Sequence, residues 1–516
     1  MTSPPDVEKM NSRVEVQSNS LPGVSTPNGV STPPEKPAFE LVEWNSPDDP
    51  GNPQNWPLRT KLLRSSAPLA VIFSISFASS VFGAATGVTA QEYAISQEVM
   101  SLGVALCVAG YAVGPLVFAP MAEVLGSAIV LSVALTGCAI FQIPLAVAQN
   151  VSTILVSRFL AGTLGAGGLA VGSGILADVY GPIHRGVAVG LSAAIMNLGS
   201  TIAPIVGNYV VARYTWRWTA WITLVLQAAV GLLCMFLLRE TSHNRILMWR
   251  AARLRRETRN ENLRARAETV SLNPRVLLRK YGTKPVRMFC KEPILQVMTL
   301  YLILVYGSLY LSYQLFPRAF QAHGWSVPAS SLPFLAVGLG VMTALVMFSW
   351  FTLTWYKTRW EAWQTTTVDC EGSGTGKSVR IAPEHRLPPM VLGAVMLPPA
   401  LLWFGWSGNT HWSSQLIASF FIGLALQIIF ISGIVYIVDV YQPFNVVSAI
   451  SIHVMMRSLV SATFPMFEGP MYEALHIEYT ATLLAVLSAV IMVSPILLII
   501  YGPRIRSWSR FSVGGI

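Results

Sequence analysis

A few charged and polar side chains interrupt the long apolar stretches of this chain, and they are the residues that could do chemistry. Arg158 lies within one such stretch, in the segment RFLAG, and His453 and Arg457 lie four residues apart in another. Residues four apart share one face of a helix. If these stretches cross a membrane, each ionisable group costs roughly 2.5–3.5 kcal/mol on insertion scales and is expected to face a bundle interior or an aqueous cavity. These three side chains are therefore the first candidates for function.

Two interpretations are open for the basic residues. Arg158 suits proton coupling, and it equally suits a structural role in which the guanidinium binds neighbouring backbone carbonyls. His453 carries an imidazole, which titrates near neutral pH in water and makes this residue a candidate proton carrier. We favour the alternative for His453, a hydrogen-bonding residue that lines a cavity together with Arg457.

Another stretch presents aromatic rings with a polar handle on one helical face, formed by Tyr306, Tyr310, Tyr313 and Gln314. Such a face suits flat, amphipathic organic ligands, which bind by stacking and a few hydrogen bonds, although helix packing explains it nearly as well. Amides in two further stretches could add polar contacts at mid-depth, where many secondary transporters bind their substrates. The predicted substrate cavity comprises Asn197, Tyr306, Tyr310, Gln314, Gln427, His453 and Arg457.

The composition of the chain indicates a membrane protein. Hydrophobic residues make up 53% of the 516 residues and charged residues only 12%, against roughly 25% charged residues in soluble domains. Each apolar stretch approaches the ~20 residues that a helix needs to cross ~30 Å of hydrocarbon, and helices satisfy their own backbone groups, which lipid cannot. We predict an all-α membrane protein with spans near residues 66–90, 98–119, 128–148, 152–177, 186–211, 216–239, 292–317, 330–352, 389–407, 412–438, 445–467 and 479–502.

A strongly basic stretch divides these twelve spans into six and six. Between Arg245 and Lys291 there are fourteen Lys and Arg residues and three acids, an excess of eleven that exceeds the net charge of +10 of the whole chain. We interpret this stretch as the connector between two six-helix lobes. The predicted organisation is a disordered, Pro- and Ser-rich cytoplasmic tail (residues 1–60), an N-terminal lobe (61–240), the connector (241–291), a C-terminal lobe (292–503) and a short cytoplasmic tail (504–516).

Loop charge predicts the orientation of the chain, because Lys and Arg are retained on the cytoplasmic side. Bases precede the first span, fill the connector and follow the last span, whereas the opposite loops hold Glu92, Glu98, Glu473 and Glu478 with few bases. Both termini and the connector are therefore predicted to be cytoplasmic. The connector could also bind anionic lipid headgroups. Nucleic acid is not an expected partner, because no folded recognition module accompanies the charge.

No enzymatic, metal or nucleotide site is expected, and no cofactor. The segment EGSGTGKS at residues 371–378 resembles a phosphate-binding loop, but Glu371 stands where the motif requires glycine, so we interpret the segment as a flexible Gly/Ser linker. The seven histidines include no HExxH pair and no Cys/His cluster with ligand spacing, and no GxSxG elbow occurs. Energy for uphill transport would then come from an ion gradient.

An ordered series of segments along the chain resembles a known family, the fungal drug:proton antiporters with twelve spans in the major facilitator superfamily. The matches run from WNSPDDPGNPQNWP (residues 44–57), through RFLAG, ADVYGPIHRG, WRW, PEHRLPP and YIVDVY, to YGPRIRSWS (residues 501–509). The resemblance implies the major facilitator fold, in which two lobes rock about a central site and give alternating access. It also implies a proton-coupling role for Arg158.

The segment LGSTIAPIVGN is similar to the fifth-span antiporter motif of that family. Gly199, Pro204 and Gly207 match the motif, while Ala203 and Asn208 replace glycines. In the family, the Gly and Pro residues kink this helix and pack it against its neighbour. This likeness is the chief reason to expect export rather than import.

The chain departs from the family pattern after the second span. Family members usually have Glu, then Gly followed by two basic residues, and this chain has Glu123 and Gly126 followed by Ser127 and Ala128. The resemblance implies that the two bases join charge contacts that hold the cytoplasmic side of the N-terminal lobe shut. We expect a less firmly latched outward-facing state, unless Arg185 in the next cytoplasmic loop substitutes for them.

These observations predict a transporter that exports small hydrophobic organic compounds by proton-coupled alternating access. The substrate class that the resemblance implies includes drugs, toxins and endogenous secondary metabolites, and the aromatic, weakly charged spans favour a hydrophobic substrate over a polyamine. A monomer in the plasma membrane is expected, with the substrate, protons and the lipid bilayer as its partners. The alternatives are a proton-coupled importer and a membrane sensor that transports nothing.

Overall fold

The computed structural model describes residues 40–46, 48–269, 282–361, 382–441, 443–509 and 511. Within this part of the chain, twelve helical segments are long and apolar enough to cross a membrane, and each overlaps one predicted span. The prediction of an all-α membrane protein with twelve transmembrane helices is confirmed. Residues 1–39 and the linker-like segment 371–378 lie outside the described residues.

The first six spans form one lobe, in which some spans consist of consecutive helices. They are α1 (Leu58–Val81) continued by η3 (Phe82–Ala85) and α2 (Thr86–Glu92), α3 (Gln97–Leu125), α4 (Ser127–Ile140) continued by α5 (Gln142–Ala146), α6 (Val151–Val179), α7 (Pro182–Arg213) and α8 (Trp218–Leu237). Between the lobes lie α9 (His243–Thr258), β2 (Leu263–Arg264), η4 (Arg266–Thr269) and α11 (Lys284–Lys291).

The last six spans form the second lobe. They are α12 (Pro293–Ala322), α13 (Phe334–Phe351) continued by η7 (Thr352–Tyr356), α15 (Pro388–Trp406), α16 (Trp412–Val440), α17 (Pro443–Ser461), and α18 (Phe464–Ile491) with α19 (Val493–Trp508). A short helix, η8 (Pro383–Arg386), precedes α15. Within α18 the backbone of His476 has φ 54°, and the helix is kinked there.

Local sequence signals determine where several helices begin and end. The Asn150 side chain accepts a hydrogen bond from the backbone N–H of Thr153 at 2.8 Å and caps α6. Proline stands at the start of α7 and of α12, where its missing N–H is not needed. Gly126, with φ 96°, ends α3 in a backbone conformation that residues with a Cβ rarely adopt.

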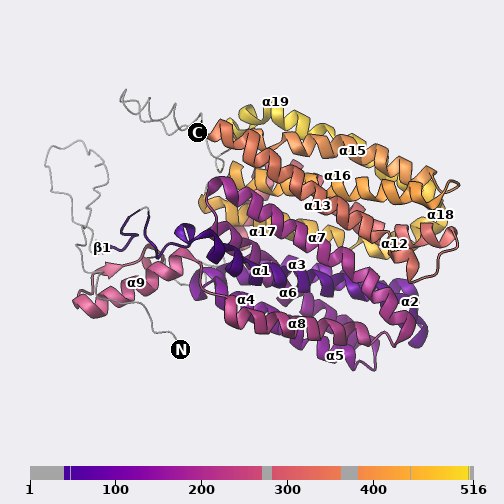
Figure 1. Ribbon diagram of the computed structural model, residues 1–516, viewed down its shortest axis with the longest axis horizontal. Coiled ribbons are helices and arrows are strands. Elements are labelled where there is room, and N and C mark those ends of the chain that lie inside the picture. The colour runs from indigo at the N-terminus through magenta and orange to yellow at the C-terminus, as the bar shows by residue number, and fades with distance from the viewer. Residues whose placement is uncertain are drawn as a thin grey trace.

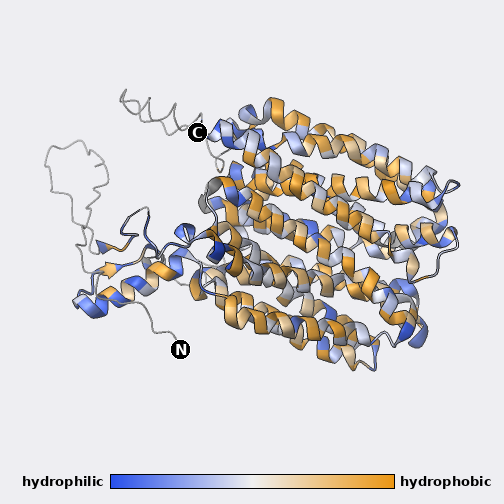
Figure 2. Ribbon diagram, viewed as in Figure 1, coloured by the Kyte–Doolittle hydropathy of each residue, from blue (hydrophilic) through white to orange (hydrophobic). Residues whose placement is uncertain are grey.

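The two lobes lie side by side with their helices roughly along the long axis of the molecule (Figure 1). Hydrophobic residues predominate along the helices of both lobes, and hydrophilic residues gather on α9 and at the helix ends (Figure 2). Large apolar side chains remain exposed in the isolated chain, such as Phe236 at 83% and Met235 at 80%. In a bilayer these side chains face hydrocarbon, so the exposure is consistent with a membrane protein.

Small residues let α3 and α6 approach until their backbones touch. A Cβ atom at Gly110 would lie 2.6 Å from the backbone N of Thr163, and one at Gly162 would overlap the Cys107 carbonyl. Close approach of this kind holds helices together in lipid, where no hydrophobic effect drives them together. The first lobe therefore has a rigid, tightly packed centre.

Contacts between the lobes are made by side chains. Gly190 of α7 lies beside Ile431 of α16, so that a Cβ there would be 3.1 Å from the isoleucine methyl group. Gly338 of α13 lies beside Leu198 of α7 in the same way, at 3.5 Å. The α3 and α17 helices form the second contact between the lobes.

The segment before the first span packs on the connector. β1 (Glu40–Leu41) pairs in parallel with β2, Val42 is buried against α9, and Asp49 forms an ion pair with Arg250 at 2.7 Å. The disordered tail expected for residues 1–60 thus has defined structure from Glu40 onward. β1, α9 and the C-terminal end of α19 all lie at one end of the molecule (Figure 1).

The α3–α6 contact can be tested with a matched pair of glycines in α6. Gly162→Val should lower the melting temperature of the purified protein, because an overpacked helix contact costs about 1–3 kcal/mol or more. Gly174→Val is the control, since no atom lies within 4 Å of a Cβ built there. Equal melting temperatures for the two variants in differential scanning fluorimetry would contradict the close α3–α6 packing.

Candidate functional site

Four helices bring polar side chains together near their midpoints. Asn197 of α7, Tyr306 of α12, Gln427 of α16 and His453 of α17 each lie near the middle of their helix. The Asn197 amide donates a hydrogen bond to the Gln427 side-chain oxygen, which joins the two lobes. All four side chains are buried. The centre of the molecule therefore holds polar groups at mid-depth of the membrane.

Arg457 lies in this centre beside two aromatic rings that pack against each other. Its guanidinium carbon is 4.1 Å from the ring centroid of Tyr306 and 5.0 Å from that of Phe430. Tyr306 also packs edge-on against Tyr310, with centroids 5.4 Å apart. A cation over aromatic faces is attracted by the ring quadrupole, and the attraction strengthens where water is excluded. The rings thus hold the guanidinium in a defined position.

His453 lies one helical turn from Arg457. Its Nδ1 is 3.3 Å from the hydroxyl oxygen of Thr299 on α12, and the imidazole is 2% exposed. Its second nitrogen, Nε2, has no hydrogen-bond partner among the described residues. His453 therefore fits a hydrogen-bonding role toward a further group.

The structure brings together most of the predicted cavity residues, namely Asn197, Tyr306, Tyr310, Gln427, His453 and Arg457. The side chain of Gln314 lies outside the described residues. Sequence reasoning missed Phe430 and Thr299. A signal for Phe430 was present, because it follows Gln427 by three residues and so shares its helical face.

Arg158 is fully hydrogen-bonded to backbone carbonyls. Its Nε donates to Gly103 O at 2.9 Å, and its two terminal nitrogens donate to Ala78 O at 2.6 Å and to Ser79 O at 2.5 Å. The guanidinium carbon also lies 5.1 Å from the Phe82 ring centroid. Arg158 is 1% exposed. The carbonyl-binding arrangement joins α1, α3 and α6, and a coupling role for Arg158 stays a prediction.

The residues of the antiporter-like motif pack α7 on α1. A Cβ at Gly199 would lie 2.6 Å from the Phe73 carbonyl oxygen, and one at Gly207 would lie 2.8 Å from the Ala84 Cβ. Pro204 lies inside α7, which continues to its end as one helix. The two glycines therefore allow backbone contact between the helices.

The Glu240 carboxylate lies at the N-terminus of α4. This helix begins with Ser127 and Ala128, which stand where the family pattern has two basic residues. The carboxylate accepts hydrogen bonds from the backbone N–H of Ser127 at 3.1 Å and of Ala128 at 3.3 Å. It also accepts from the N–H of Thr241 and Ser242. A carboxylate is favourable at a helix N-terminus, where unpaired N–H groups carry partial positive charge.

The other predicted gate residues lie around this carboxylate. A Cβ at Gly126 would overlap Glu240. Arg245 of α9 donates to the Val124 carbonyl at 3.2 Å, next in sequence to Glu123. Arg185 donates to the carbonyl of Ala177 at 3.2 Å. Arg185 thus contacts the end of α6, and the connector helix supplies a base beside the end of α3.

Burial lowers the pKa of His243, at the start of α9. Its imidazole donates to the backbone of Asp178 and packs edge-on against Trp44, with ring centroids 5.9 Å apart. The segment before the first span, the connector and α6 therefore meet at one residue.

A buried charge cluster in the second lobe faces the first lobe at the same end. Arg386, which is 1% exposed, donates to Asp439 at 2.9 Å, and its guanidinium lies 3.5 Å from the Tyr356 ring centroid. A Cβ at Gly186 of α7 would lie 2.9 Å from Arg386 Nη1. Sequence reasoning missed this cluster, although the segments PEHRLPP and YIVDVY supply its two charged members.

Two further acids bind residues at the C-terminal end of α19. Glu384 binds Arg506 through both oxygens, at 2.8 and 3.0 Å. Glu292 accepts from the hydroxyl of Ser509 at 2.8 Å, and burial raises the pKa of Glu292 above its usual range. These contacts attach α19 to η8 and to the start of α12.

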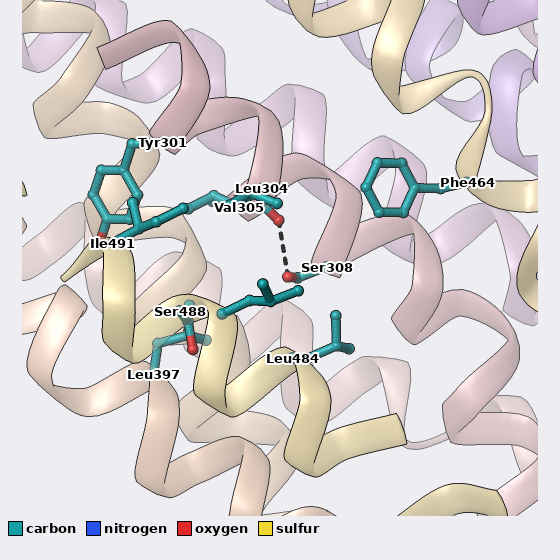
Figure 3. Close-up of a pocket in the computed structure, with 10 residues that line it drawn as sticks. Tyr301, Leu304, Val305, Ser308, Leu397, Phe464, Leu484, Ser488 and Ile491 are labelled. Carbon is teal, nitrogen blue, oxygen red and sulfur yellow. Dashed lines mark hydrogen bonds between the residues drawn. The ribbon is translucent and has the colours of Figure 1, made fainter. Parts of the chain in front are cut away.

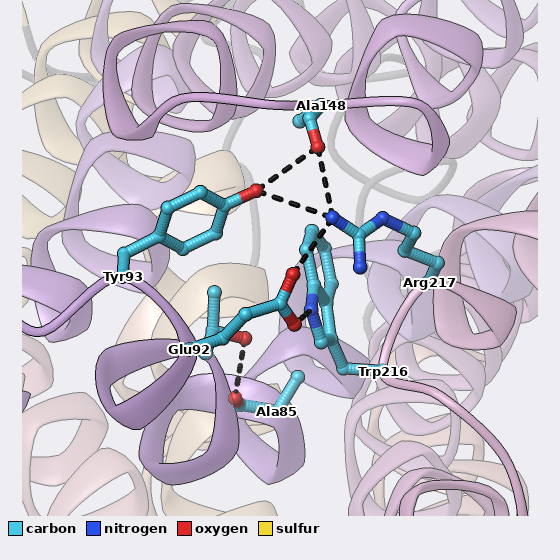
Figure 4. Close-up of polar contacts among 7 residues, drawn as sticks. Ala85, Glu92, Tyr93, Ala148, Trp216 and Arg217 are labelled. Atoms are coloured by element: carbon cyan, nitrogen blue, oxygen red, sulfur yellow. Dashed lines mark hydrogen bonds and ion pairs between the residues drawn. The ribbon is translucent and has the colours of Figure 1, made fainter.

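At the opposite end of the first lobe, one cluster links three loops (Figure 4). Glu92 forms an ion pair with Arg217 at 2.8 Å and accepts from the Trp216 indole at 2.6 Å. The Tyr93 hydroxyl and Arg217 both donate to the Ala148 carbonyl, at 2.9 and 3.1 Å. The cluster explains the matched WRW segment as a structural clamp.

A small cavity lies between α12, α15 and α18 (Figure 3). Its volume is about 30 Å³, and its lining includes Tyr301, Ser308, Leu397, Phe464, Leu484 and Ser488. The Ser308 hydroxyl is already bonded to the Leu304 carbonyl at 2.8 Å. The space matches one water molecule, so it is not the substrate site. The described residues include no group of three or more His, Cys, Asp or Glu side chains that could hold a metal ion.

Comparisons with known proteins identify the family. Residues 69–371 match the model of the Major Facilitator Superfamily. The chain is 39% identical over 477 residues to the citrinin biosynthesis cluster MFS transporter of Monascus ruber, covering 92% of each chain. It is 41% identical over 480 residues to the ascochitine biosynthesis cluster MFS transporter of Didymella fabae, covering 92% of this chain and 89% of the relative. A multidrug transporter of Candida glabrata is 33% identical over 486 residues, covering 93% and 81%.

Solved structures share the fold. The proton:xylose symporter XylE superposes with a TM-score of 0.60 at 15% identity, covering 85% of this chain and 96% of that chain. The human organic anion transporter MFSD10 superposes with a TM-score of 0.54 at 16% identity, covering 86% and 100%. The chain belongs to the Major Facilitator Superfamily and is a multi-pass membrane transporter, not an enzyme.

Glu240 provides a test of the contacts at the start of α4. Glu240→Ala should lower the free energy of unfolding by about 1–3 kcal/mol, because buried N–H groups lose their acceptor. Glu257→Ala is the matched control, since its carboxylate is 53% exposed and pairs with an exposed arginine. Denaturation of both variants in detergent checks this, and a Glu240→Ala protein as stable as Glu257→Ala would contradict the capping role.

Proposed function

We propose that this transporter exports small hydrophobic organic compounds, such as a drug, a toxin or an endogenous secondary metabolite, by proton-coupled alternating access. The observation that carries the proposal is the buried central cluster, in which aromatic faces and polar groups from both lobes meet at mid-depth. Relatives named for secondary-metabolite clusters and for multidrug transport support the substrate class.

Alternating access requires contacts between the lobes that open without breaking either lobe. The Asn197–Gln427 hydrogen bond joins side chains, and so do the apolar contacts around Gly190 and Gly338. Inside the first lobe, by contrast, backbones touch at Gly110 and Gly162. Rocking of two rigid lobes would therefore separate only side chains, with the central cluster as the site that is exposed alternately.

The charged groups support a hydrophobic substrate over a polyamine. Asp439 is paired with Arg386, and Glu92 is paired with Arg217. Neither carboxylate is available at the centre to bind an ammonium group. Export is preferred over import because Gly199 and Gly207 pack α7 on α1 as the antiporter motif would.

The proposed location is the plasma membrane, and the proposed oligomeric state is a monomer. Both termini and the connector are proposed to lie on the cytoplasmic side. The basic connector supports this orientation, because Lys and Arg are retained on that side. The expected loosening of the cytoplasmic latch stays a prediction. Glu240 and Arg245 contribute the contacts around the position of the two absent bases.

Cellular accumulation tests the direction and the energy source. Cells that express the protein should accumulate less of a panel of labelled aromatic compounds than cells without it, and a protonophore should remove the difference. The panel must include neutral and acidic members. Higher accumulation in expressing cells would favour an importer, and unchanged accumulation for every compound would favour a sensor.

Arg158→Ala tests the proposed coupling role. The variant should lose uphill export in proteoliposomes with an imposed pH gradient while the purified protein still binds a substrate. The change also removes three hydrogen bonds from a charged group to backbone carbonyls, at roughly 1.5–3 kcal/mol each, so monodispersity and melting temperature must be measured alongside. Arg253→Ala, at an exposed ion pair on α9, is the control. Uphill export by Arg158→Ala with a normal pH dependence would refute the coupling role.

A further inference from the structure

Among the described residues three arginines are buried, and two of them have carbonyl or carboxylate partners. Arg158 binds three carbonyl oxygens, and Arg386 binds the Asp439 carboxylate. Arg457 is 6% exposed, yet its Nε and Nη1 reach no hydrogen-bond acceptor among the described residues. A guanidinium presents five donors in a fixed fork and remains charged in proteins. Burial of this charge without a hydrogen-bond acceptor is unfavourable, unless another group supplies the acceptor.

Two side chains near Arg457 also carry nitrogen atoms that have no hydrogen-bond partner among the described residues. His453, one turn away, leaves Nε2 without a partner. Gln427 leaves Nε2 without a partner after its oxygen has bonded to Asn197. Gln427 lies one turn from Phe430, whose ring packs against the Arg457 guanidinium. The centre therefore combines one positive charge with several free donors, which is the pattern that recognises an anion.

Aromatic faces surround the charge. The rings of Tyr306 and Phe430 both lie within 5.0 Å of the guanidinium carbon, and they pack against each other with centroids 5.7 Å apart. Rings of this kind stack on planar, unsaturated ligands. A protonated amine at the same position would instead face an uncompensated positive charge, which disfavours it.

We propose that the central site selects aromatic compounds that carry an acidic group, a carboxylate or an ionised phenol, and that Arg457 binds that group. This proposal rests on the proposed transport function and narrows its substrate class. The anion would occupy the free donors of Arg457, with Gln427 and His453 beside it.

Equilibrium binding to the full-length protein in lipid nanodiscs tests the proposal without any gradient. The probes are radiolabelled naphthoate, its neutral amide and the cationic naphthylmethylamine, which share one ring system and differ in charge. The wild-type protein should bind naphthoate about tenfold or more tightly than the amide, a difference of ~1.4 kcal/mol or more, and should bind the amine least. Arg457→Gln should abolish the preference for naphthoate over the amide, whereas Arg457→Lys should retain part of the preference.

Arg318→Gln is the matched control, because Arg318 also lies over a tyrosine ring, 5.1 Å from the centroid of Tyr472. Its preference for naphthoate should equal that of the wild type. Melting temperatures separate a ligand-binding role from a structural one. Arg457→Met keeps an apolar stem beside the two rings and removes the buried charge, so it should melt no lower than the wild type. A wild-type protein that binds the three probes equally, or does not bind naphthoate, would overturn the proposal, as would an Arg457→Gln protein that keeps the preference.

The outcomes also separate this proposal from the transport function. Charge selectivity in nanodiscs with no proton-dependent export in cells would sink the proposed function alone. Proton-dependent export of neutral and acidic compounds alike, with no effect of Arg457→Gln on either, would refute the anion site and leave the exporter standing.

Discussion

A charged side chain inside a lipid-embedded bundle must be neutralised or hydrogen-bonded, because no water is present to solvate it. The arrangement of this transporter follows from that constraint. Arg158 takes carbonyls from two neighbouring helices, and the salt bridge between Arg386 and Asp439 lies where the lobes meet. Arg457 has no such carboxylate or carbonyl at its Nε and Nη1 among the described residues, and it lies at mid-depth beside the contact between the lobes. Arg158 and Arg386 are bound by groups of the protein and so have structural roles. Arg457 keeps unused donors, which a ligand could bind.

Packing divides the molecule into parts that stay together and parts that separate. Glycines bring α3 onto α6 and α1 onto α7 with backbone in contact, so those helices cannot slide without overlap. Between the lobes, the contacts at Asn197, Gly186, Gly190 and Gly338 are made by side chains. Side chains change partners at low cost, whereas tightly interdigitated backbones do not. Rigid lobes with an adaptable interface are what alternating access needs.

Much of this could be predicted from the sequence, because the signals are local. A run of about 20 apolar residues is a span wherever it lies, and four-residue spacing puts His453 beside Arg457. The partners of Arg158 could not be predicted, since Ala78, Ser79 and Gly103 offer only backbone carbonyls, which every residue has. The same holds for Glu240, whose carboxylate caps a helix more than a hundred residues earlier in the chain.

The sequence by itself determined the membrane environment, the number of spans and the few polar residues that could serve a substrate, because hydropathy and helical periodicity act over short stretches of chain. Only the tertiary structure decided which of those polar residues already have hydrogen-bond or charge partners within the protein. Arg158 and Arg457 look alike in sequence, as single arginines in apolar helices. One meets three carbonyls and the other meets two aromatic rings, and this difference depends on which helices pack around them.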